Sequence, residues 1–125
     1  QAKLVAVLDW ELSTLGDPRV DLASQIMQWS MPQGKNGRGL EGLDRKKFGI
    51  PEDNEFIEEY TINAKLGDVP DLTFAIPFCF FRMGAILQGV RKRALDGNAS
   101  NPEKAIKLGE YVSVFAQKAL THIGE

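Results

Sequence analysis

The chain has 125 residues, which is enough for one domain or for part of one. Apolar residues make up 43% of it and charged residues 26%, as in an ordinary globular protein, so the composition excludes a disordered chain as the default. The net charge of −2 gives no basic excess for nucleic acid or an anionic membrane surface, and the longest apolar run, around residues 74–81, is too short to span a membrane.

The chain begins with a strand pattern, residues 3–8, in which residues 5–8 form a continuous apolar run typical of a buried β-strand. A lone strand cannot satisfy its own backbone hydrogen-bonding groups, so its partner has to come from upstream sequence or from another chain. Because neither an initiator Met nor a lead-in precedes this run, we expect the chain to be a piece of a longer protein. The unpaired strand also predicts a homodimer in which residues 3–8 pair across two copies.

The first helix has a clear start, because Asp17 is a typical N-cap and Pro18 suits the first helical position. Met31-Pro32 ends it. Between these points the apolar residues recur at spacings of three and four and predict one buried stripe, made of Leu22, Ala23, Ile26, Met27 and Ser30.

A glycine-rich segment, residues 32–43, follows and predicts a mobile loop. It lacks the strand before it and the helix directly after it that a phosphate-binding loop needs. The second helix is expected over residues 51–66, where Gly67 ends it. Its inward face is predicted to consist of Phe56, Ile57, Tyr60 and Ala64.

A third helix is expected over residues 71–95, with Asp71 as its cap and with either a kink or a late start at Pro77. A cap followed by proline opens the last helix, residues 102–123. The predicted fold class is therefore mainly α, with one N-terminal β-strand that forms half of a hairpin, followed by about four helices.

Few side chains beyond the first segment offer chemistry. Cys79, the only cysteine, excludes an internal disulfide, and its apolar surroundings predict a buried residue and a reducing, cytoplasmic compartment. His122, the only histidine, is expected at the surface near the end of the chain. Asp9 differs because it directly follows the apolar strand. Its carboxylate either projects into a cleft as a metal-binding or catalytic group, or caps the following turn, and the spacing alone leaves both open.

A motif surrounds this aspartate. It reads Leu8-Asp9-Trp10-Glu11, Ser13-Thr14, Gly16-Asp17-Pro18 and Asp21-Leu22-Ala23. The pattern resembles the signature of the aminoglycoside phosphotransferase-like kinases, the small-molecule branch of the protein-kinase fold, and most of all the subgroup fused to, or encoded with, acyl-CoA dehydrogenases. "FGIP" at 48–51 and "FFRMGAILQGVRKRAL" at 80–95 resemble that subgroup as well, so the resemblance covers nearly the whole chain.

The resemblance implies a role for each early aspartate. Asp9 matches the metal-binding aspartate and would hold Mg²⁺, which aligns the phosphates of ATP. Asp21 matches an aspartate that supports the catalytic loop, and Asp17 caps the helix. The later helices would form one wall of the acceptor site, where arginines suit an anionic hydroxylated acceptor such as a hydroxyacyl-CoA or hydroxy acid. The candidate substrate-binding residues on that wall are Arg82, Gln88 and Arg93.

The chain departs from the family's pattern in two ways. A catalytic loop of the form His-x-Asp-x-x-x-x-Asn is missing, since His122 is the only histidine, and the nucleotide-binding N-terminal lobe is missing too. The resemblance therefore predicts that residues 1–125 are the C-terminal helical part of an ATP-dependent small-molecule phosphotransferase, without catalytic residues of its own and inactive alone. Two alternatives stay open: a non-catalytic helical interaction module or degenerate kinase remnant, and a small helical ligand-binding domain without kinase ancestry.

Overall fold

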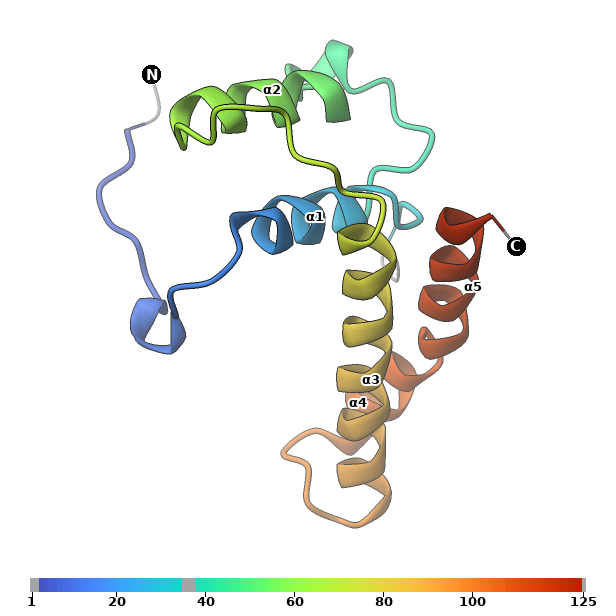
Figure 1. Ribbon diagram of the computed structural model, residues 1–125. Coiled ribbons are helices and arrows are strands. Elements are labelled where there is room, and N and C mark those ends of the chain that lie inside the picture. Colours follow the sequence, from blue (N-terminus) through green and yellow to red (C-terminus); the bar gives the residue numbers. More distant parts are fainter. Residues whose placement is uncertain (1–2, 35–37, 125) are drawn as a thin grey trace.

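The computed structural model describes residues 3–34 and 38–124, and this part of the chain is mainly helical (Figure 1). The mainly α part of the predicted fold class is confirmed. Two short 3-10 helices occupy Trp10–Leu12 and Lys46–Phe48. The α-helices among the described residues are α1 (Pro18–Trp29), α2 (Asp53–Asn63), α3 (Ala75–Leu95), α4 (Pro102–Gly109) and α5 (Val112–Ile123).

The long helix α3 stands at the centre of the fold (Figure 1). It packs against α1, α4 and α5, whereas α2 packs against α1 on the far side from most of α3. The core lies where these helices meet, and Phe80 at its centre is completely buried. The cluster of buried residues is Leu22, Ala23, Ile26, Met27, Met31, Leu72, Ala75, Cys79, Phe80 and Phe115.

Helix α1 forms as its sequence predicts. The Asp17 carboxylate accepts a hydrogen bond from the backbone N–H of Arg19 at 3.0 Å, which satisfies one of the amides that a helix start leaves free. Pro18 occupies the first helical position, where its missing N–H costs nothing. The predicted apolar stripe is buried, except that Ser30 lies half-buried just past the last turn.

Helix α3 begins later than the predicted cap at Asp71. That carboxylate accepts the backbone N–H of Thr73 at 2.9 Å and closes a turn, and the helix itself starts at Ala75. Pro77 consequently lies in the first turn, where a helix has no acceptor for its N–H, so the late start predicted as one of two outcomes is the one observed.

The last predicted helix, residues 102–123, is divided in two. Glu110 and Tyr111 donate their N–H groups to Lys107 and Leu108, three residues back rather than four, and this tightening ends α4. Gly109, a weak helix former, lies at the break and is buried, and a Cβ atom added there would lie 2.5 Å from the side chain of Arg91 of α3. The apolar spacing continues across the break, which is why the sequence pattern predicts a single helix.

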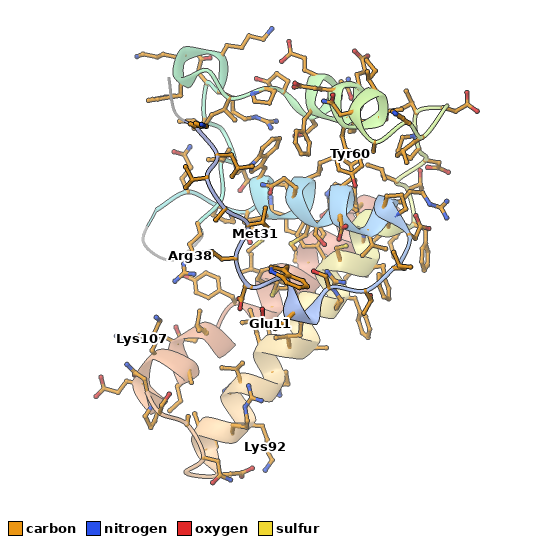
Figure 2. The ribbon with its side chains drawn as sticks, turned by 90° about the vertical axis from the view of Figure 1, so that its left-hand side faces the viewer. Glu11, Met31, Arg38, Tyr60, Lys92 and Lys107 are labelled. Atoms are coloured by element: carbon orange, nitrogen blue, oxygen red, sulfur yellow. The ribbon has the colours of Figure 1, made fainter. Side chains whose placement is uncertain are left out.

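Helix α2 is shorter than predicted at both ends. Glu52 and Glu55 form a capping box at its start, with the Glu52 N–H donating to the Glu55 carboxylate at 2.9 Å. Its inward face contacts α1 through aromatic rings, and the centroids of Phe56 and Trp29 are 4.8 Å apart. Tyr60 lies half-buried between the two helices (Figure 2). Ala64 was expected on this face but is exposed, because the helix has already ended.

The glycine-rich segment folds back onto the end of α1. The N–H of Gly39 donates to Pro32 at 3.0 Å, and the N–H of Leu40 donates to Trp29 at 2.8 Å. The described ends of this segment are therefore hydrogen-bonded, and the predicted mobility of its centre, residues 35–37, lies outside the described residues.

The predicted N-terminal strand is not formed among the described residues. Residues 3–8 carry no strand assignment, and their apolar side chains are exposed, Val5 at 87% and Leu8 at 82%. Figure 1 shows this segment running away from the helices. The physical reason is the one that the sequence implies, since a strand needs a hydrogen-bonding partner and the described chain supplies none here. Self-association through residues 3–8 stays a prediction. No helix in the described ranges has the length and apolarity to cross a membrane.

Candidate functional site

Asp9 lies on the exposed N-terminal segment rather than at the end of a buried strand. Its backbone adopts the left-handed conformation, φ 63°, which aspartate tolerates better than most residues, and it precedes the short 3-10 helix. The side chain makes no capping hydrogen bond to that helix, so of the two interpretations left open the turn cap is not observed. Nearby Glu11 also lies on this segment (Figure 2).

Asp17 and Asp21 both lie at the start of α1. Asp17 forms an ion pair with Arg19, whose Nη2 approaches Oδ2 to 2.5 Å, and these hydrogen bonds hold the pKa of Asp17 below its usual value. Asp21 is exposed in the first turn, where the helix dipole favours a negative charge. The helix-capping role of Asp17 is confirmed, whereas support of an active site by either residue stays a prediction.

Arg82 of α3 is bound to α1. Its Nη2 donates to Ser24 Oγ at 2.9 Å, and the same hydroxyl lies 3.4 Å from the sulfur of Cys79. The thiol in turn donates to the carbonyl of Val20 at 3.6 Å, so Cys79 is a buried packing residue as predicted. One guanidinium nitrogen of Arg82 therefore forms a hydrogen bond that connects α3 to α1.

The three predicted substrate-binding residues do not converge. Arg82 and Arg93 are 11 residues apart, which places them on one side of α3 but about 16 Å apart along its axis. Gln88 lies on another side and lines an apolar cavity of about 190 Å³ between α3 and α5. A single small acceptor therefore does not contact all three.

Arg93 lines a separate cavity of about 290 Å³ between the end of α3 and the start of α4. Lys104 contributes a second positive charge, and the loop between the helices contributes side-chain hydrogen-bond donors. The Asn101 side chain accepts the N–H of Lys104 at 3.0 Å and so fixes the start of α4 beside the cavity. The polar members of the lining are Arg93, Asn98, Ser100, Asn101 and Lys104.

His122 is exposed near the end of α5, as the sequence analysis expected, but its surroundings were not predicted. Its ring stacks on buried Phe80 with centroids 5.4 Å apart, and it lines a cavity of about 440 Å³ formed with α1, α2 and the start of α3. Burial, and next the nearby charge of Lys118, lower the pKa of His122, while Asp53 acts in the opposite direction. Its position in the sequence, three residues before Glu125, gave no signal of this environment.

Comparison with known proteins covers nearly the whole chain. It is 39% identical over 127 residues to the mouse protein named acyl-CoA dehydrogenase family member 10, a match spanning 99% of this chain and 12% of that protein. The chain is similar to acyl-CoA dehydrogenase family members. Chicken acyl-CoA dehydrogenase family member 11 is 36% identical over 96% of the chain and 16% of its own length. The Arabidopsis thaliana protein named probable acyl-CoA dehydrogenase IBR3 is 31% identical over 97% of the chain and 15% of its own length.

The chain therefore spans about an eighth to a sixth of the length of these relatives. No protein-family model and no solved structure matches it. These names agree with the association with acyl-CoA dehydrogenases in the sequence resemblance, and the relatives are named as members of an enzyme family. A kinase-like family or fold is not shown.

The predicted function, an ATP-dependent phosphotransferase, is wrong by the same comparison, because the relatives are named as acyl-CoA dehydrogenase family members and not as kinases. The alternative of a helical interaction module or kinase remnant gains no support either. The error came from transferring the activity of a family through a resemblance whose most specific part is the motif at residues 8–23.

The described residues do not form a complete metal site. Groups of three or more His, Cys, Asp or Glu side chains placed to hold a cation are absent from residues 3–34 and 38–124. Mg²⁺ usually keeps several waters and takes one or two carboxylates, so Asp9 as a magnesium ligand stays a prediction that needs further groups from outside this chain. ATP as a co-substrate is equally untested.

Proposed function

We propose that the chain is a helical part of a larger enzyme related to the acyl-CoA dehydrogenase family, and that this whole enzyme acts on an acyl-CoA. The observation that carries the proposal is the similarity to three such proteins over 96–99% of this chain. A match of this extent aligns the helices and their connections together rather than one short motif. The matched part is a minor share of each relative, so the activity belongs to the complete protein.

The cavity at Arg93 supports a role in binding the substrate. Coenzyme A carries several phosphate groups, and a cavity with one arginine, one lysine and amide or hydroxyl donors provides complementary charge and hydrogen bonds. Arginine is suited to this role because its planar guanidinium can bind two phosphate oxygens at once. In this proposal Arg93 and Lys104 contact the phosphates, and the acyl end lies against parts of the enzyme outside this chain.

The test uses the complete protein and measures oxidation of acyl-CoA substrates of different chain lengths with an artificial electron acceptor. The double variant Arg93→Gln/Lys104→Gln should raise KM for the acyl-CoA about tenfold, equivalent to about 1.4 kcal/mol, with kcat little changed. Lys107→Gln is the matched control. This lysine lies on α4 but points away from α3 and α4 (Figure 2), and it does not line the cavity. Absence of acyl-CoA oxidation by the complete protein would refute the proposed activity, and an unchanged KM in the double variant would refute the binding role.

We further propose that Asp9 supplies one carboxylate to a magnesium site completed by other parts of the whole protein. Its exposure leaves the oxygen atoms accessible, and Glu11 stands two residues away on the same segment. Calorimetric titration of the complete protein with MgCl₂ should show binding that Asp9→Asn weakens and that Glu58→Gln, an exposed acid on α2, leaves unchanged. Equal binding by the wild-type protein and Asp9→Asn would remove Asp9 from the site.

A further inference from the structure

A second polar cavity is lined by none of the residues that the sequence analysis selected for a site. It has a volume of about 440 Å³ and forms where α1, α2, the connection before α3 and the end of α5 come together. Figure 1 shows the end of α5 on one side of the first turns of α3 and α1 on the other, with α2 above them. The volume falls within the range of pockets that hold small organic molecules.

The floor of this cavity is apolar. Ile26 of α1 is buried there, and isoleucines of α2 and α3 lie half-buried on either side. Leu72 completes the surface from the connecting segment. A ligand would therefore bury a hydrocarbon portion against Ile26, Ile57, Leu72 and Ile76.

The rim of the cavity is acidic. Asp71 remains ionised at neutral pH, because hydrogen bonds from Thr73 hold the pKa of its carboxyl below the usual value. Asp53, on the first turn of α2, also lines the cavity, and its Oδ1 accepts Arg45 Nη1 at 2.7 Å, which leaves its second oxygen for another donor. Among the described residues that line the cavity there are two carboxylates and neither Lys nor Arg.

The cations nearest to this rim are each paired with a carboxylate, and one partner of Arg45 is Asp53 of the rim itself. Arg45 bridges Asp53 and Glu52, and its side chain is mostly buried in that position. Lys118 is paired with Glu41. Arg19, whose charge reaches Asp71, is held by Asp17. The polar rim is completed by groups that can accept or donate hydrogen bonds without a net positive charge: Asn54, Thr73 and His122.

We propose that this cavity binds a small organic amine, whose ammonium group contacts Asp71 and Asp53 and whose apolar body lies on the isoleucine floor. The neutral rim groups, Asn54 and His122, accept the remaining ammonium protons. This site is separate from the Arg93 cavity, which lies at the other end of α3, and it does not depend on the proposed acyl-CoA activity.

The test is a titration of the ¹⁵N-labelled 125-residue chain with n-hexylamine at pH 7.5, followed by amide chemical shifts. The shifts should concentrate at Asn54, Ile57, Thr73 and His122. Two matched probes separate the contributions, since n-hexanol keeps the chain without the charge and hexanoate reverses the charge. We expect n-hexanol to bind at least about tenfold more weakly, in line with the loss of a charge-assisted hydrogen bond. Hexanoate should produce no shifts at these positions.

Single substitutions test whether the carboxylates of Asp71 and Asp53 bind the amine. Asp71→Asn should weaken hexylamine binding about tenfold, and Asp53→Asn, which leaves the Asp71 turn intact, should weaken it as well. Asp68→Asn is the control, because Asp68 is an exposed acid on the same connection that does not line the cavity. The proposal is overturned if hexylamine and hexanol bind equally, if the shifts lie elsewhere, or if Asp68→Asn weakens binding as much as the two cavity variants.

Discussion

Replacing Phe80 by alanine tests whether the core described above holds the helices together. Phe80 is 0% exposed, lies 6.1 Å from Phe115 and 5.4 Å from His122 between ring centroids, and so connects α3 to α5. Truncation of a fully buried phenylalanine removes its transfer free energy and leaves a cavity, and together these cost about 3–5 kcal/mol. A domain of this size has a total stability of about 5–15 kcal/mol, so the loss is a large part of the whole.

The neighbouring residue provides the control. Phe81 has the same side chain on the same helix but is 68% exposed, so Phe81→Ala should change the free energy of unfolding by at most about 1 kcal/mol. Urea unfolding of both variants, followed by the helical circular dichroism signal, measures the two effects. Equal destabilisation of the two variants, or a loss below about 1.5 kcal/mol for Phe80→Ala, would refute the arrangement in which α3 buries one face against α5.

Two further predictions concern a glycine and the histidine. A Cβ atom added at Gly39 would lie 1.8 Å from the carbonyl oxygen of Met31, so Gly39→Ala should displace the segment, break its hydrogen bonds to α1 and cost about 2–4 kcal/mol in urea unfolding. Gly89→Ala, with open space at the added atom in the middle of α3, should instead stabilise by about 0.5–1 kcal/mol, and the reverse order would contradict the geometry. Because burial lowers the pKa of His122 in the folded state, the unfolded chain binds a proton more readily; stability should fall as the pH drops below about 6.5 and stop falling below the folded pKa. His122→Gln should remove this part of the pH dependence, and an unchanged profile would show that another group causes it.

The helix starts could be predicted because they depend on neighbouring residues. Asp17 before Pro18 and Asn101 before Pro102 each supply a side-chain acceptor and a residue suited to the first turn, and both helices begin where these pairs stand. The buried stripe of α1 follows from spacing in the same way. The ends and breaks of helices were less predictable, because the division at Gly109 depends on its close approach to Arg91 of another helix.

The functional sites could not be predicted in the same manner. The selection of Arg82, Gln88 and Arg93 rested on residue type, and only the folded helix shows that they face different surroundings. The 440 Å³ cavity joins residues from four segments distant in sequence, so no local pattern indicates it. For residues 3–8 the composition predicts a strand, but pairing requires a second strand and the described chain does not provide one.

Helix α3 supplies a wall to both polar cavities, with Ile76 near its first turn and Arg93 near its last. Its 21 residues extend about 30 Å as one continuous helix. A rotation of α3 about its own axis would therefore reshape the two openings at the same moment, one at each end of the molecule. Mutations that weaken the packing of α5 against α3 would therefore change both cavities.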